Sequence, residues 1–281
     1  MSQLSISKAW DETAVVLARD GRLFASVALA LIVFPATVLG AFYPGGLGAV
    51  MYTAMKTSSL GLTGLVALVF LVILAGQLAI TRLAIGPSIT VGGAISHAVR
   101  RLPSYVGVAL LLGAALLVAI IIGAAIIAMT VNAQVSEEEL ARSPAVAVVV
   151  LLVFALYLFL LTRVISVAAA VTATEELGPL RIIRRAWTLT SGHFLRLFGF
   201  IVLFLIGTTV AIFAVVSVVG LGTRMLLGEM EPMSASALVL ALVAGILNGA
   251  VVVVFAVMLS RIYLQLTGAA GAQPSVPSSG A

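Results

Sequence analysis

The chain alternates between long stretches without any charged residue and short stretches that contain almost all of its charges. A helix needs about 20 apolar residues to cross the hydrocarbon core of a bilayer, because each residue rises about 1.5 Å. Six stretches meet this requirement, and none of them places a charge at the centre of a bilayer, where a charge is costly. We therefore expect six transmembrane helices: Leu23–Tyr43, Leu60–Thr81, Tyr105–Met129, Ala145–Thr162, Leu197–Leu221 and Ala235–Leu259.

A seventh uncharged stretch, Leu83–Val99, is predicted not to cross the bilayer. It is only 17 residues long, it is interrupted by Gly86-Pro87 and Gly92-Gly93, and arginines flank it on both sides. Its length is short for a span, and its Gly and Pro dipeptides are typical of turns. Six spans, an even number, would place both ends of the chain on one side of the membrane.

The composition excludes a soluble domain and most catalytic chemistry. Hydrophobic residues make up 62% of the 281 residues and charged residues 9%, whereas a soluble domain has about 25% charged residues. The chain has no cysteine and two histidines, which leaves few ligands for a metal ion. No acidic residue lies inside a predicted span to act as a general base. We expect no metal, no cofactor and no enzymatic activity.

The basic residues indicate how the spans are oriented. On the side without the termini lie only Lys56, Arg142 and Arg224. Cytoplasmic loops of membrane proteins carry an excess of Lys and Arg, so we expect both termini in the cytoplasm of a bacterial inner membrane. The residues on the side of the termini are Lys8, Arg19, Arg22, Arg82, Arg100, Arg101, Arg163, Arg181, Arg184, Arg185, Arg196 and Arg261.

A threefold internal repeat is visible in the sequence. Every second span ends in a hydroxyl residue, an arginine and a branched apolar residue: Thr81-Arg82-Leu83, Thr162-Arg163-Val164 and Ser260-Arg261-Ile262. A segment with helical spacing of apolar residues precedes each hairpin. The predicted fold is an all-α integral membrane protein: six transmembrane helices as three repeated hairpins, each preceded by an amphipathic cytoplasmic interfacial helix. The membrane domain covers residues 1–267, with repeats at about 5–83, 84–164 and 165–263, and residues 268–281 form a disordered tail.

The arginines near the inner surface are the main candidates for a binding site. Arg82, Arg163 and Arg261, the span-end arginines, either bind the phosphates of lipid headgroups or anchor the depth of their spans by snorkelling. A second group lies on the third interfacial helix, where it either attracts anionic lipid, enforces topology or docks a partner. Trp187 and Trp10 fit interface anchors. This second group comprises Arg181, Arg184, Arg185 and Arg196.

Two amides lie well inside predicted spans. Asn248 stands in Gly245-Ile246-Leu247-Asn248-Gly249, where small residues allow close helix approach and the amide can bond a neighbouring helix. Gln77 has the same character in the second span. Helix packing is the favoured role for both, and a substrate contact is the alternative.

The stretch Gly178-Pro179-Leu180-Arg181, followed by Arg184–Thr190 and Gly192–Gly199, resembles a bacterial membrane family. This family comprises six-span proteins grouped under the membrane domain of glycerophosphoryl diester phosphodiesterase. The resemblance implies a six-helix integral membrane protein of poorly defined role. The phosphodiesterase itself folds as a barrel of about 250 residues, for which the segments outside the spans leave no room.

We expect a non-catalytic multi-pass membrane protein that engages anionic lipid headgroups, or an unidentified membrane protein partner, at its basic cytoplasmic face. No nucleic acid is expected as a partner. The alternative is a transporter or permease component for an apolar or lipid-like substrate. Coupling to an ion is disfavoured, because no Asp, Glu, Lys or His lies at the middle of a span.

Overall fold

A computed structural model describes residues 4–43, 49–50, 52–53, 56, 60–86, 89–130 and 143–268. Within these ranges the chain is helical and contains no strand. Six helical stretches are long and apolar enough to cross a membrane, which confirms the number predicted from the sequence. The tail after Gly268 lies outside the described residues. The six stretches are Ile6–Phe42, Leu60–Ile85, Val91–Met129, Pro144–Thr174, Phe194–Leu227 and Ala235–Thr267.

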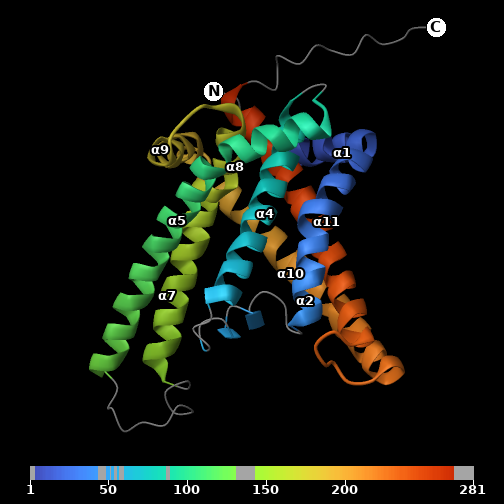
Figure 1. The fold of residues 1–281 in the computed structure, drawn as a ribbon. Coiled ribbons are helices and arrows are strands. Elements are labelled where there is room, and N and C mark those ends of the chain that lie inside the picture. Colours follow the sequence, from blue (N-terminus) through green and yellow to red (C-terminus); the bar gives the residue numbers. More distant parts are fainter. Residues whose placement is uncertain are drawn as a thin grey trace, which may run out of the picture.

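The first and last helices bring the two described ends of the chain together (Figure 1). The backbone N–H of Ser5 donates to Oε1 of Gln265 at 3.1 Å. Nη1 of Arg196 donates to the carbonyl oxygen of Leu4 at 3.1 Å. We call this side of the helix bundle the termini end, and the other side the opposite end.

The first stretch consists of α1 (Ile6–Ala28), a π-helical turn η1 (Leu29–Val33) and α2 (Phe34–Phe42). Ser5 caps α1, because its side chain accepts from the N–H of Lys8. Pro35 stands directly after the π turn, in which the N–H of Phe34 bonds the carbonyl of Leu29. Proline lacks an N–H and disturbs the regular ladder of hydrogen bonds, so a local π turn at this position is physically reasonable.

The second and third stretches are α4 (Leu60–Ile85) and α5 (Val91–Thr130). The stretch Leu83–Val99 is divided between the end of α4 and the start of α5, in agreement with the prediction that it does not form a span of its own. The expected separation of an interfacial helix from the third span is absent: α5 runs from Val91 to Thr130 without interruption and contains Pro103. Likewise α1 continues through η1 into α2, so the first predicted interfacial segment also belongs to a longer helix.

The fourth stretch extends beyond the predicted end of its span. It consists of α7 (Pro144–Leu160), the π turn η2 (Leu161–Ile165) and α8 (Ser166–Thr174). The predicted span ended at Thr162 because Arg163 follows, but the helix continues beyond Arg163. Every residue of α8 from Ser166 to Ala173 is buried, and most of them are small. α8 therefore occupies the centre of the termini end, in contact with α4, α5, α9 and α11.

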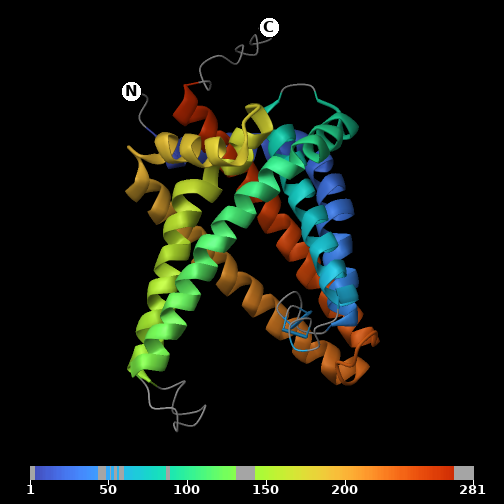
Figure 2. The same ribbon diagram turned by 60° about the vertical axis from the view of Figure 1, so that its left-hand side comes forward.

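The last three helices are α9 (Pro179–Thr190), α10 (Phe194–Leu227) and α11 (Ala235–Thr267). α9 lies across the ends of the spanning helices and is separated from α10 by a short turn (Figure 2). Its buried side chains are Ile182, Ala186 and Thr190, one turn apart from each other. α9 is thus a separate helix ahead of α10, in the segment where the sequence predicted the third interfacial helix.

The hydrophobic core is concentrated at the termini end. Its main cluster joins residues such as Val27, Ile80, Val167, Ile182 and Val257 from five different elements. Toward the opposite end α10 diverges from the hairpin of α5 and α7 (Figure 2). The termini end is thus the part of the molecule in which side chains from all three predicted repeats meet.

Candidate functional site at the termini end

Two of the span-end arginines donate to backbone carbonyls at the ends of neighbouring helices. Nη1 of Arg82 lies 3.2 Å from the carbonyl oxygen of Ala173, near the end of α8. Nη2 of Arg261 lies 2.7 Å from that of Ala84, in the last turn of α4. The last four carbonyls of a helix lack partners within it and carry partial negative charge. Both arginines therefore cap helices inside the protein, a role that the sequence analysis did not consider.

The third span-end arginine is enclosed by aromatic rings. Cζ of Arg163 lies 5.9 Å from the ring centroid of Phe159, 5.1 Å from that of Trp187 and 4.8 Å from that of Phe194. Its Nε and Nη1 atoms are buried without a hydrogen-bond partner among the described residues. Cation–π attraction to three rings offsets the missing hydrogen bonds in part, since each such contact contributes about 0.5–2 kcal/mol.

These contacts link the elements around the termini end. Arg261 of α11 reaches the end of α4, and Arg82 of α4 reaches α8. Arg163 of η2 reaches α9 and α10, and α10 packs against α11. Each span-end arginine therefore contacts a part of the chain outside the predicted repeat that carries it.

The four arginines of the third interfacial helix fall into two pairs. Arg185 donates from Nε to Glu175 at 3.1 Å, and Arg196 donates to the carbonyl of Leu4. Arg181 and Arg184 are exposed and have no ion-pair or hydrogen-bond partner in the described part of the chain. Only these two of the four are free to bind a group outside the protein.

Exposed apolar side chains lie on the same helix as the free arginines. Leu180 is 71% exposed and Trp187 is 42% exposed. Trp10, the other predicted anchor, is half exposed on α1. A basic helix that also exposes leucine and tryptophan has the character of a helix in the interface of a membrane.

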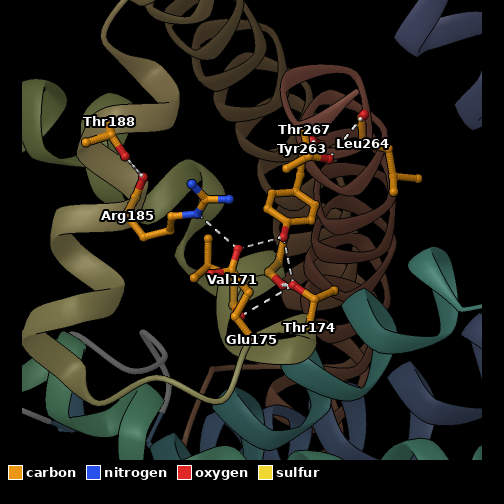
Figure 3. A network of polar contacts seen from close by, with 9 residues as sticks. Val171, Thr174, Glu175, Arg185, Thr188, Tyr263, Leu264 and Thr267 are labelled. Atoms are coloured by element: carbon orange, nitrogen blue, oxygen red, sulfur yellow. Dashed lines mark hydrogen bonds and ion pairs between the residues drawn. The ribbon is translucent and has the colours of Figure 1, made fainter. Parts of the chain in front are cut away.

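A polar network under α9 was missed by the sequence analysis (Figure 3). Oε1 of Glu175 accepts from the hydroxyl of Tyr263 at 3.2 Å and from Arg185, and Oγ1 of Thr174 lies 2.8 Å from the same hydroxyl. The neighbouring Glu176 forms an ion pair with Arg101 of α5. The signal was present in the sequence, because these glutamates are the only acids between Arg163 and Arg196.

The two intramembrane amides have different surroundings. Oε1 of Gln77 accepts from the hydroxyl of Tyr105 at 3.4 Å, which connects α4 to α5. Asn248 is exposed, and no hydrogen bond to its side chain is found within the described residues. It lines a largely apolar cavity of about 390 Å³ between α2, α4, α10 and α11. The adjacent Gly249 makes the close helix contact instead, because a Cβ there would lie 2.7 Å from Val33.

The described residues contain no group of three or more His, Asp or Glu side chains that could hold a metal ion. Comparisons of the chain with known protein families, characterised proteins and solved structures find no match. The termini end thus combines the buried helix α8, arginines that contact other parts of the protein, and two exposed arginines on α9.

Proposed function

We propose that this chain is a non-catalytic membrane protein that binds anionic lipid headgroups through α9. The observation that carries the proposal is that Arg181 and Arg184 are exposed and have no ion-pair or hydrogen-bond partner among the described residues. They lie beside the exposed Leu180 and Trp187. Each Lys or Arg near an anionic membrane surface contributes about 1 kcal/mol of attraction. Two free arginines on a helix across the ends of the spans therefore favour lipids with a net negative headgroup.

The proposed setting is the bacterial cytoplasmic membrane, with both termini in the cytoplasm. The support is the excess of Lys and Arg on the segments of the termini end, since cytoplasmic segments of membrane proteins are enriched in these residues. We also propose three repeated hairpins and membership of the six-span family named for the membrane domain of glycerophosphoryl diester phosphodiesterase. The repeated position of the three span-end arginines supports the repeats, and the resemblance of residues 178–199 supports the relationship to this family.

Not every candidate arginine belongs to the proposed lipid site. Arg82 and Arg261 are engaged by carbonyls of the protein, and Arg185 by Glu175. Arg163 has a positioning role, because its guanidinium holds Trp187 against the end of α7. We assign the phosphate contacts to Arg181 and Arg184.

The test uses the full chain in detergent, with phosphatidylglycerol as the anionic probe. Native mass spectrometry measures the apparent affinity for this lipid in the wild type and in Arg181→Gln/Arg184→Gln. The double variant should bind about 30-fold more weakly, which corresponds to about 2 kcal/mol for two charges. Lys56→Gln/Arg224→Gln is the matched control, because both residues are exposed and lie on the predicted outer side. Equal affinities of the two double variants would exclude α9 as the site.

The cavity beside Asn248 favours one second candidate, a permease component for an apolar or lipid-like substrate. Apart from the amide of Asn248, which has no hydrogen-bond partner among the described residues, the cavity is lined almost entirely by apolar residues. This is the usual composition of a site for a small apolar ligand. Transport of a fluorescent lipid between the leaflets of proteoliposomes tests this function. Transport above that of protein-free vesicles, lost in Asn248→Leu, would support it, and transport at the protein-free rate would contradict it.

A further inference from the structure

A cavity of about 340 Å³ lies beside α1 at the termini end, on a surface that the proposed lipid site does not use. It is lined by four charged residues, two of each sign, and by two valines. None of them lies on α9. The lining residues are Asp11, Glu12, Val15, Val16, Arg19 and Arg261.

Arg261 supplies a buried positive charge to this cavity. Its side chain is only 5% exposed, and its one hydrogen bond goes from Nη2 to the neutral carbonyl of Ala84. Its Nε is buried and has no partner among the residues that the structure describes. A buried charge is expected to be paired, because its desolvation is costly. An anion in the cavity would supply a counter-charge to the guanidinium.

The acidic residues of the cavity do not supply it. Neither Asp11 nor Glu12 lies within 4.0 Å of the guanidinium of Arg19 or Arg261. Glu12 contacts only the exposed Lys8, at 3.9 Å, and Arg19 pairs with the neighbouring Asp20. Asp11 forms no ion pair within the described part of the chain. Glu12 therefore attracts Arg261 only at longer range, and no carboxylate of the described residues lies within ion-pair distance of the Arg261 guanidinium.

This arrangement discriminates between headgroups. A purely anionic headgroup would be attracted by the two arginines but repelled by Asp11 and Glu12. A headgroup with both a phosphate and an ammonium is attracted by both pairs, the phosphate by the two arginines and the ammonium by Asp11 and Glu12. The cavity has no aromatic lining residue, whereas quaternary ammonium groups are typically recognised by aromatic side chains. Carboxylates instead accept hydrogen bonds, which a primary ammonium donates and a trimethylammonium does not.

A surface of mixed polar and apolar character continues from the cavity. A second cavity of about 290 Å³ shares Arg19 and is lined also by Asp20, Gly86 and the apolar side chains of Leu23, Phe24, Leu83 and Ile89. In the first cavity Val15 is 67% exposed. The charged groups therefore adjoin apolar side chains on one helix, as the headgroup and the glycerol and acyl region adjoin in a phospholipid.

We propose that the cavity beside α1 binds a phosphate ester that carries a primary ammonium, in the form of phosphatidylethanolamine. The phosphate contacts Arg261 and Arg19, and the ammonium donates to Asp11 and Glu12. This site and the proposed function both require the termini end to lie at a bilayer surface, but they use different residues and lipids of different charge. Their tests therefore fail independently.

The experiment compares the full chain with phosphatidylethanolamine and with phosphatidylcholine by native mass spectrometry, because the two lipids differ only in the methyl groups on nitrogen. The wild type should bind phosphatidylethanolamine about tenfold more tightly, the change expected for one charge-assisted hydrogen bond. Asp11→Asn/Glu12→Gln should lose this preference and keep its affinity for phosphatidylglycerol. Arg181→Gln/Arg184→Gln should keep the preference for phosphatidylethanolamine and lose affinity for phosphatidylglycerol.

A matched control and a soluble probe complete the test. Glu229→Gln/Glu231→Gln removes two exposed acids elsewhere on the chain and should keep the wild-type preference. Displacement of phosphatidylethanolamine by free phosphoethanolamine supports the proposed headgroup chemistry. If free phosphoethanolamine binds as tightly as phosphatidylethanolamine, the ligand of the cavity is a soluble phosphate ester and not a lipid. Equal affinity of the wild type for the two lipids, or an unchanged preference in the Asp11/Glu12 variant, would overturn the proposal.

Discussion

The same spanning helices run through the termini end and the opposite end of this bundle, yet only the termini end is well packed. In α11 every residue from Ala256 to Gln265, at the termini end, is buried, whereas none is buried from Leu238 to Ala244, nearer the opposite end. Lipid chains are as apolar as leucine, so apolar surface alone gives no strong reason for helices to associate in a membrane. The difference indicates that polar contacts and small residues determine where this bundle closes.

The polar contacts are distributed accordingly. The termini end contains the capping arginines Arg82 and Arg261, the enclosed Arg163 and the network of Glu175. Nearer the opposite end the helices meet mainly through small residues, for example at Gly123, where a Cβ would lie 2.4 Å from the side chain of Val149. Changes at the two ends should therefore differ strongly in effect.

The largest difference is expected for Arg261→Ala. This change leaves the carbonyl of Ala84 without its partner and opens a cavity in a buried region, so the unfolding free energy should fall by about 3 kcal/mol. Thermal unfolding in detergent, followed by circular dichroism, measures the loss. Arg224→Ala, at an exposed position in the last turn of α10, should change stability by less than about 0.5 kcal/mol. Equal losses would show that the termini end does not hold the bundle together.

A smaller effect is expected from overpacking a helix contact with Gly249→Leu. A Cβ at this glycine of α11 would lie 2.7 Å from Val33, so the larger side chain should separate α11 from η1 at a cost of about 2 kcal/mol. Gly207→Leu is the matched control on α10, where a Cβ meets nothing within 4 Å. The same unfolding experiment compares the two variants, and a destabilising effect of Gly207→Leu as large as that of Gly249→Leu would contradict the contrast between α11 and α10.

The smallest effect is expected for Arg163→Lys, which keeps the charge but loses the planar guanidinium that stacks on the rings. We expect a loss of about 1 kcal/mol and a change in the fluorescence of Trp187, measured in a Trp10→Phe background. Arg22→Lys, at an exposed position on α1, provides the control. An unchanged emission spectrum in Arg163→Lys would mean that Arg163 does not position this tryptophan.

Much of the fold was predictable because the relevant physics is local. The absence of charge over about 20 residues is sufficient to identify a span, and the glycines and Pro87 were sufficient to reject Leu83–Val99. The fourth span was predicted to end at Thr162, because Arg163 follows it in the sequence, but the helix itself does not end there. In the structure three rings contributed by η2's neighbours enclose its guanidinium, and the helix continues into α8.

The sequence identified the residues of the candidate site but not the partners that they contact. Arg82, Arg163 and Arg261 were recognisable by their repeated position, and the alternatives considered for them were lipid binding and anchoring. The partners of Arg82 and Arg261 are backbone carbonyls, which have no signature in sequence. Nor could the sequence separate Arg181 and Arg184 from Arg185, since all three lie on one helix and only the approach of Glu175 distinguishes them.

By itself, the sequence determined the number of spans, the side on which basic residues gather and the scarcity of groups for metal or catalytic chemistry. These properties depend on the free energy of transferring each segment from water to lipid, which is nearly independent of the rest of the chain. Only the tertiary structure decided which arginines are used inside the protein and which are free, and which charges face one cavity. Those outcomes depend on distances between segments far apart in the chain, and packing alone sets such distances.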